Sequence, residues 1–266
     1  MKYYYLLLLS LLLVVGIACK DNHHDSFHED IINQIETKEI GTLSKADSII
    51  NDAILAHGGE KYNVADYSFV FRNKKFRFQN NNNSYIYIAE FQKGDTVIKD
   101  VLKDGKFERY MNTNLQNIKA AESSKYSEAL NSVIYFATLP YKLNDASVRK
   151  KYIEKVQFKN DSYDVIEVTF DIEGGGKDFE DEFYYWINKS THKMDYLAYR
   201  YHTNDGGIRF REAYNRRVVD GITFQDYINY EAPFEASLQE LPQWLQSGRL
   251  KEVSRIETEH IINNNQ

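Results

Sequence analysis

The residues best suited to acid–base chemistry are acidic side chains in the second half of the chain. Asp178, Glu180, Asp181 and Glu182 follow three consecutive glycines at positions 174–176. General acid–base catalysis needs two such carboxylates held near a substrate with separated pKa values. An acidic run beside three glycines is more typical of a solvated hairpin loop, and it lacks the strand–loop–helix context of a phosphate-binding loop. We therefore interpret this stretch as a loop.

Asp226 is a more specific candidate because it interrupts an apolar pattern. Ile222, Phe224, Ile228 and Tyr230 occupy the alternate positions around it and would share its face in a strand. An acidic side chain that points inward needs a cationic or hydrogen-bonding partner. Asp226 would then form a buried ion pair or a polar anchor in a pocket. The candidate partners are Arg200, Arg209 and Arg211.

Histidines and acids gather near the amino terminus, where imidazole and carboxylate groups suit several transition metals. The group consists of His23, His24, Asp25, His28 and Glu29. It lies in a polar stretch with no apolar pattern to fix its geometry. We interpret it as a solvated linker and expect no metal and no cofactor.

Other catalytic motifs give no signal. His57 precedes two glycines, which predicts a helix end with the histidine near the carboxyl terminus, where the dipole favours a cation. No serine stands in a Gly-x-Ser-x-Gly context. We expect a protein that is not an enzyme. The alternative left open is an envelope-polymer hydrolase that would use Asp226 together with Asp181 and Glu182.

Cys19 is the one cysteine of the chain and follows the apolar run Leu6–Ala18. This run is too short to cross a bilayer core of roughly 30 Å, which requires about 20 residues. With Lys2 before it and small residues at its end, it has the layout of a secretory signal.

The segment Val15–Cys19 resembles the lipobox of bacterial lipoproteins, although Gly16 stands where a leucine is usual. The resemblance implies a signal peptide over residues 1–18, acylation (palmitate) of Cys19, a polar tether over 19–43 and a single domain over 44–266. Lys20-Asp21-Asn22 resembles the sorting signal of Bacteroidota lipoproteins. We expect a lipid anchor in the outer membrane and leave its periplasmic or surface face open.

Composition narrows the class of partner. The chain has a net charge of −6, which argues against a basic surface for nucleic acid. Its 21 Tyr and 15 Phe residues favour strands, so we expect a sheet with broad apolar faces.

Alternating apolar positions and short Gly-containing turns predict a mainly β (α+β) fold. Ser44 and Asp47 predict a capped helix that ends at His57. Further helices are expected near 125–137 and 237–246. We predict a curved antiparallel sheet or half-open β-barrel of about ten strands, with two or three covering helices. The last strand is expected over Arg249–Glu259.

The chain also resembles the periplasmic lipoprotein-carrier (Lol-like) superfamily. The matching residues are Ile54–Gly59, at a helix-to-strand entry, and Tyr184–Met194, which contains an Asn188-x-x-Thr191 turn between strands. The segment Gly221–Tyr227 is similar to uncharacterised Bacteroidota lipoproteins. The resemblance implies a half-open barrel whose helices plug an apolar cavity.

We therefore expect a membrane-anchored lipoprotein that binds or carries a hydrophobic or amphiphilic ligand. An accessory subunit that contacts an envelope protein partner is left open as an alternative. A helix with Leu238, Leu241, Trp244 and Leu245 is a candidate lid, and a helix that simply covers the core is an equally good interpretation. The expected ligand-binding residues are Tyr67, Phe69, Phe71, Tyr85, Tyr87, Leu197, Tyr199, Tyr201 and Asp226.

Overall fold

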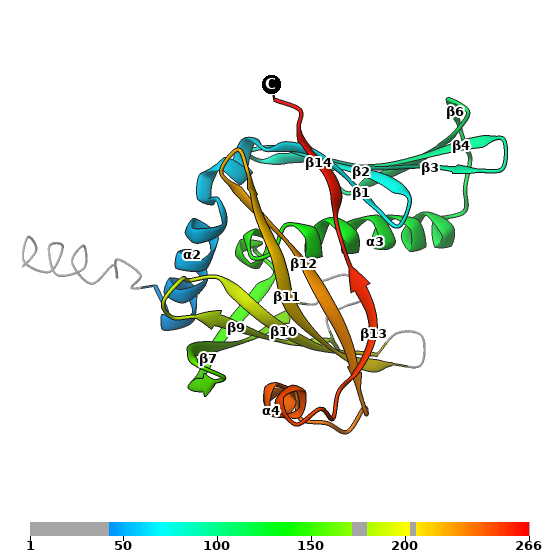
Figure 1. Cartoon of the computed structure of the whole chain (residues 1–266). Helices are drawn as coiled ribbons and strands as arrows, with labels where there is room; N and C mark the ends of the chain where they lie inside the picture. The colour runs from blue at the N-terminus through cyan, green and yellow to red at the C-terminus, as the bar shows by residue number, and fades with distance from the viewer. Residues whose placement is uncertain (1–42, 172–179, 203–205, 266) are drawn as a thin grey trace, which may run out of the picture. The chain divides into compact units, whose positions relative to one another are not determined.

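The computed structural model describes residues 43–171, 180–202 and 206–265 (Figure 1). All elements described below belong to one unit that begins at Leu43. The expected signal peptide, the tether, Cys19 and the histidine-rich group near it lie outside the described residues, and so do the three glycines at 174–176 and Asp178.

Seven antiparallel strands form the first sheet, in the order β14-β1-β2-β3-β4-β5-β6 (Figure 1). Consecutive strands pair through tight turns, and Asp104 and Gly105 both have positive φ, as a type I′ turn requires. The strands are β1 Asp66–Phe71, β2 Lys74–Asn81, β3 Ser84–Lys93, β4 Thr96–Lys103, β5 Lys106–Met111, β6 Asn114–Leu115 and β14 Glu259–Asn263.

A second seven-stranded antiparallel sheet follows the order β13-β12-β11-β10-β9-β8-β7. The predicted mainly β, open arrangement with covering helices is confirmed, but two sheets take the place of one. The strands are β7 Val148–Phe158, β8 Asp161–Phe170, β9 Glu182–Asn188, β10 Met194–Tyr201, β11 Gly207–Val219, β12 Ile222–Ala232 and β13 Lys251–Ile256.

The carboxyl-terminal segment joins the two sheets. β13 pairs with β12 in the second sheet, and β14 pairs with β1 in the first. The single strand expected over Arg249–Glu259 is therefore wrong. Glu257 and Thr258 carry the chain from one sheet to the other, and their polar side chains continue the exposed pattern of the flanking strands, so no sequence signal marks the break.

Helix α3, Ala120–Ala137, packs against both sheets. Leu130 and Ile134 belong to the core cluster of the first sheet, with Phe76 and Phe78 of β2. Tyr135 and Phe136 pack against the core of the second sheet. The helix runs beneath the first sheet in Figure 1.

Helix α2, Lys45–His57, covers the inner face of the second sheet through Ile50 and Ala53. Its predicted amino-terminal cap is confirmed, because Ser44 Oγ accepts a hydrogen bond from the Asp47 backbone N–H at 3.1 Å. Short 3₁₀ helices lie at η1 Gly59–Val64, η2 Tyr141–Asn144 and η4 Leu238–Glu240.

Helix α4, Leu241–Gln246, packs on the outer face of the second sheet. Leu238 and Leu241 contact the cluster that contains Trp186 and Phe210. The lid interpretation of this segment is wrong, because the helix covers the face opposite to Phe183 and Tyr185. Both faces of the second sheet are thus buried, which accounts for many of the aromatic residues.

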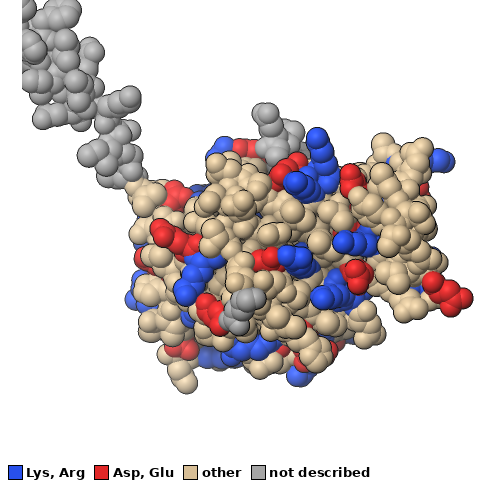
Figure 2. All heavy atoms as spheres, turned by 90° about the horizontal axis from the view of Figure 1, so that it is seen from above, with Lys and Arg blue, Asp and Glu red and all other residues tan. Residues whose placement is uncertain are grey.

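No helix in the described part of the chain has the length and apolar character needed to span a bilayer. On the face of the molecule shown in Figure 2, basic and acidic side chains are interspersed, so neither sign of charge forms a continuous field there.

The end of α2 confirms the predicted helix stop at Gly58. The expectation that His57 would be the cation at this helix terminus is wrong. Gly58 has φ 144°, and a Cβ there would lie 3.1 Å from the Ile222 side chain. His57 is fully buried and donates from Nδ1 to the Ala53 carbonyl at 2.8 Å. Burial lowers the pKa of His57 to about 4, so the ring is neutral. The cation at this helix terminus is Lys193, which donates to the Ala56 carbonyl.

Burial of a neutral histidine predicts an acid-sensitive fold. Between its ordinary pKa of 6.5 and about 4, the unfolded chain binds a proton at His57 and the folded chain does not. The free energy of unfolding should therefore fall by roughly 3 kcal/mol through this group as the pH drops through that window. In urea titrations at pH 7 and pH 4, His57→Leu should lose less stability than the wild type.

The matched control is His192→Asn, a substitution at an exposed histidine whose positive φ of 55° suits asparagine. It should lose as much stability as the wild type. If His57→Leu lost as much stability between pH 7 and pH 4 as the wild type, His57 would not be the group that makes the fold acid-sensitive.

Candidate functional site

A cavity of about 400 Å³ lies between the two sheets, beside α3. This volume is within the range of small-molecule binding sites. Its walls come from β1, α3, β9 to β12 and the segment that crosses between the sheets. The lining residues are Phe69, Phe71, Arg72, Ser132, Val133, Phe136, Ala137, Asp181, Phe183, Tyr199, Tyr201, Arg209, Arg211, Gln225, Tyr227, Ile256 and Thr258.

Aromatic rings form much of this wall. Phe183 of β9 and Tyr199 of β10 stack with ring centroids 5.3 Å apart. Phe136 of α3 lies 5.5 Å from Tyr199, and Phe69 and Phe71 approach from the first sheet. Such faces favour apolar ligand groups and leave orientation to the polar residues among them.

Arg211 is the most deeply buried cation of the cavity, with 7% of its surface exposed. Its Nη2 donates to the Tyr199 hydroxyl at 2.8 Å, and its Cζ lies 3.9 Å from the centroid of the Phe136 ring. Arg209, two residues earlier on the same strand face, stacks its Cζ 5.3 Å from the Tyr201 ring.

Asp181 is the one carboxylate among the lining residues that the structure describes. It accepts a hydrogen bond from the His202 backbone N–H at 3.2 Å, and burial raises its pKa. The neighbouring Glu182 instead pairs with Arg200, whose Nη2 donates to the Ala236 carbonyl on the outer face of the second sheet. These two acids do not converge on one substrate position, so the geometry does not favour the hydrolase alternative.

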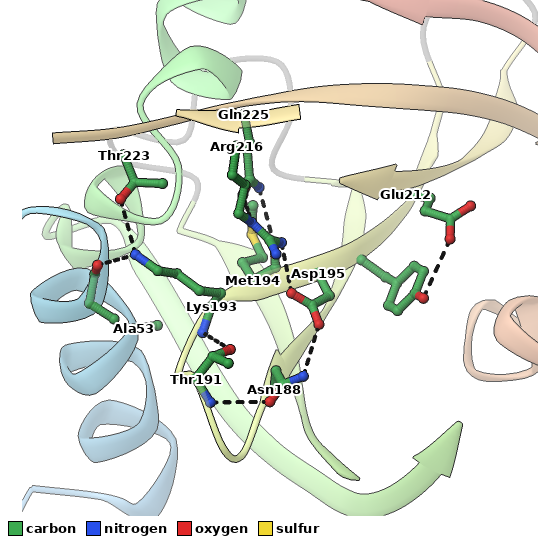
Figure 3. Close-up of polar contacts among 12 residues, drawn as sticks. Ala53, Asn188, Thr191, Lys193, Met194, Asp195, Glu212, Arg216, Thr223 and Gln225 are labelled. Carbon is green, nitrogen blue, oxygen red and sulfur yellow. Dashed lines mark hydrogen bonds and ion pairs between the residues drawn. The ribbon is translucent and has the colours of Figure 1, made fainter. Parts of the chain in front are cut away.

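The Asn188 turn, on which the carrier-like resemblance was based, has a structural role. Asn188 Oδ1 accepts hydrogen bonds from the backbone N–H groups of Ser190 and Thr191 at 2.9 and 3.2 Å (Figure 3). Its Nδ2 donates to Asp195 at 3.1 Å. The side chain thus fixes the turn between β9 and β10 and connects it to the neighbouring strand.

A chain of hydrogen bonds continues from this turn to the cavity (Figure 3). Asp195 accepts from Arg216 Nη2 at 2.7 Å, and Arg216 Nε donates to Gln225 Oε1 at 2.9 Å. Gln225 Nε2 then donates to the Tyr227 hydroxyl at 2.7 Å. Because Gln225 and Tyr227 both line the cavity, the network holds two of its polar groups in place.

The structure places four of the expected ligand-binding residues at the cavity: Phe69, Phe71, Tyr199 and Tyr201. The other expected residues lie outside its lining, as the contacts of Tyr67, Leu197, Tyr85, Tyr87 and Asp226 show. Tyr67 packs in the core of the first sheet against Phe78, and Leu197 is buried in the core of the second. Tyr85 and Tyr87 stack on each other at 4.5 Å.

Asp226 is buried, with 2% of its surface exposed, but its partners differ from those expected. Arg217 Nη2 and the Thr258 backbone N–H donate to Oδ1 at 2.9 Å each, and Asn215 Nδ2 donates to Oδ2 at 2.7 Å. The expected partners Arg200, Arg209 and Arg211 are wrong. A bulge between Tyr214 and Arg217 shifts the register of β11, and alternation read from the sequence cannot detect it.

Sequence reasoning missed the contribution of α3 and treated Arg211 only as a partner for Asp226. Arg209 and Arg211 alternate within an apolar strand, so their shared face was a usable signal. Val133 and Phe136 carried no such signal, since apolar residues on a helix indicate only that one face is covered. Among the described residues, no group of three histidine, cysteine or acidic side chains is placed to hold a metal ion.

The chain belongs to DUF6503, a family of unknown function, whose model matches residues 41–258. No match was found among curated proteins.

Three solved structures are similar, each at 10% sequence identity. A LolA superfamily protein from Nitrosomonas europaea has a TM-score of 0.46 and covers 83% of this chain and 94% of its own. A Vibrio parahaemolyticus domain described as an outer membrane lipoprotein-sorting protein has a TM-score of 0.46, with 84% and 94% covered. A DUF1329 family protein from Desulfovibrio piger ATCC 29098 has a TM-score of 0.40, with 82% and 93% covered.

The contacts of Asp226 predict a structural role in joining the sheets. Asp226→Ala should lower the free energy of unfolding by about 3 kcal/mol, because it leaves Arg217 and Thr258 without their buried acceptor. Chemical denaturation measures this change. Glu231→Ala, on the same strand, removes a solvent-exposed pair with Lys251 and should cost far less stability than Asp226→Ala. Equal losses in the two variants would contradict the assignment.

Proposed function

We propose that this DUF6503 protein binds a hydrophobic or amphiphilic molecule in the cavity between its sheets and acts as a non-enzymatic lipid-binding protein of the cell envelope. The observation that carries the proposal is the hollow itself. Rings from both sheets and from α3 surround it, and a few polar groups, among them Arg211 and Gln225, lie at fixed positions in its wall.

The geometry favours an apolar guest over a polar one. Each methylene group that leaves water for such a wall contributes about 0.8 kcal/mol, so a chain of about ten would gain roughly 8 kcal/mol before the entropic cost of binding. Phe69, Phe71 and Val133 offer apolar contact along the cavity, whereas Gln225 and Tyr227 are engaged with each other. A guest without an apolar part would leave this apolar surface uncovered.

The envelope location in this proposal comes from the amino-terminal sequence. The lipobox-like Val15–Cys19 segment would anchor the protein through acyl chains on Cys19. The domain would then bind its ligand at the membrane surface from which the ligand comes. Mass spectrometry of the amino-terminal peptide tests the acylation separately from the cavity.

Filling the cavity tests the proposed function. Val133→Trp places a large side chain in the cavity wall and should reduce, about tenfold or more, the lipid that organic solvent extracts from the purified full chain, measured by mass spectrometry. Solvent removes only non-covalent lipid, so acyl chains on Cys19 do not contribute.

The matched control is Ala129→Trp, which adds the same side chain at an exposed position of α3 outside the cavity. It should retain the wild-type amount of lipid. Ser132→Trp, at a more exposed lining position, serves as a second blocking variant if thermal unfolding shows that Val133→Trp is misfolded. Equal lipid in the blocked and control variants would contradict the proposal.

A further inference from the structure

Two arginines of this protein are equally buried but differ in their partners. Arg109 and Arg211 are each 7% exposed. Arg109 donates from Nε and Nη2 to the two oxygens of Asp100 at 2.6 and 2.7 Å, a bidentate ion pair. Arg211 has a hydroxyl and the face of a ring as neighbours, and no carboxylate of the described residues pairs with it.

The Nε of Arg211 is buried and has no hydrogen-bond partner in the described structure. An arginine keeps its positive charge at physiological pH, and a buried charge without a counterion is strongly unfavourable. The side chain lines the cavity, so an anion bound there would lie beside a guanidinium whose charge no described carboxylate balances. A guanidinium is suited to this task because its planar donors match the oxygens of a carboxylate or a phosphate.

The other charged residues of the cavity lining also favour a negatively charged ligand. Arg72, Arg209 and Arg211 line it together with a single described carboxylate, Asp181. Asp181 is already engaged with His202. The lining is therefore cationic in a chain whose net charge is −6. A buried cation such as Arg211 attracts an anion more strongly than the same charge on the surface.

We propose that the ligand is an anionic amphiphile, with its carboxylate or phosphate head bound by Arg211 and its apolar tail against the rings of the cavity. The inference rests on the proposed function and adds the chemistry of the head group. The Tyr199 hydroxyl accepts a hydrogen bond from Arg211, and the ring face of Phe136 packs against the guanidinium. Arg209 lies on the same strand face and adds a second positive charge.

The experiment compares two probes with the same apolar tail, one with an anionic carboxylate head and one with a neutral ester head. Fluorescent cis-parinaric acid and its methyl ester are each titrated into two delipidated full-length proteins, the wild type and Arg211→Met. The wild type should bind the acid at least about tenfold more tightly than the ester. Arg211→Met should weaken binding of the acid by about tenfold to a hundredfold and leave the ester unchanged.

Two further variants separate charge from shape. Arg211→Lys keeps the charge and should restore part of the preference for the acid. Arg255→Met removes an exposed arginine of β13 that pairs with Glu252 and should bind both probes as the wild type does. If Arg211→Met does not fold, Arg209→Met replaces it, with a smaller expected loss of acid binding.

The outcomes distinguish the two proposals. Equal binding of acid and ester to the wild type, or equal weakening of both by Arg211→Met, would overturn the head-group assignment and leave the hydrophobic cavity in place. Binding of neither probe would overturn the proposed function as well. Dodecyl phosphate and inorganic phosphate, added as competitors, separate an amphiphile from a free anion: displacement of the acid by inorganic phosphate alone would contradict the proposal.

Discussion

The packing of α3 against two sheets at once is the constraint on which the cavity depends. Leu130 and Ile134 fit the core of the first sheet, while Tyr135 and Phe136 meet the second. Where the helix lies, it holds the inner faces of the two sheets apart, whereas Phe224 of β12 packs directly against Tyr67 and Phe78 of the first sheet. Beside the helix, the rings of Phe69 and Tyr199 enclose space that the side chains of the described residues do not fill.

The junction between β13 and β14 supplies the second requirement. The two strands lie at the edges of different sheets, so Thr258 has to stay fixed for both edges to be paired. Asp226 fixes it from β12, with Arg217 balancing the buried charge. The acidic residue that looked most like a ligand anchor in the sequence thus stabilises the frame of the cavity. Arg211 lacks such a partner within the described protein, and this contrast separates a structural charge from one available to a ligand.

Local signals predicted much of the fold. The Ser44 cap, the Gly58 stop and the positive-φ turns act within a few residues, so their physics is complete in the sequence. Four of the nine expected ligand-binding residues line the cavity, because Phe69, Phe71, Tyr199 and Tyr201 alternate along strands and so share the inner faces of the sheets. The β11 bulge escaped prediction because it depends on pairing with β12, and alternation alone does not report an inserted residue.

The sequence by itself determined both ends of α2, the hairpins, the antiparallel class and the apolar faces, since each depends on side-chain period and on capping or turn residues close together in the chain. The start of α3 at Ala120, five residues before the expected position, has no side-chain cap to mark it. Only the tertiary structure decided that the strands divide into two sheets, that α3 lies between them, and that α4 covers the far face. It also decided which charges are paired, because the partners of Asp226 and Arg211 come from segments remote in sequence. Contacts between residues far apart in the sequence depend on how the two sheets are placed, and no local sequence pattern encodes that placement.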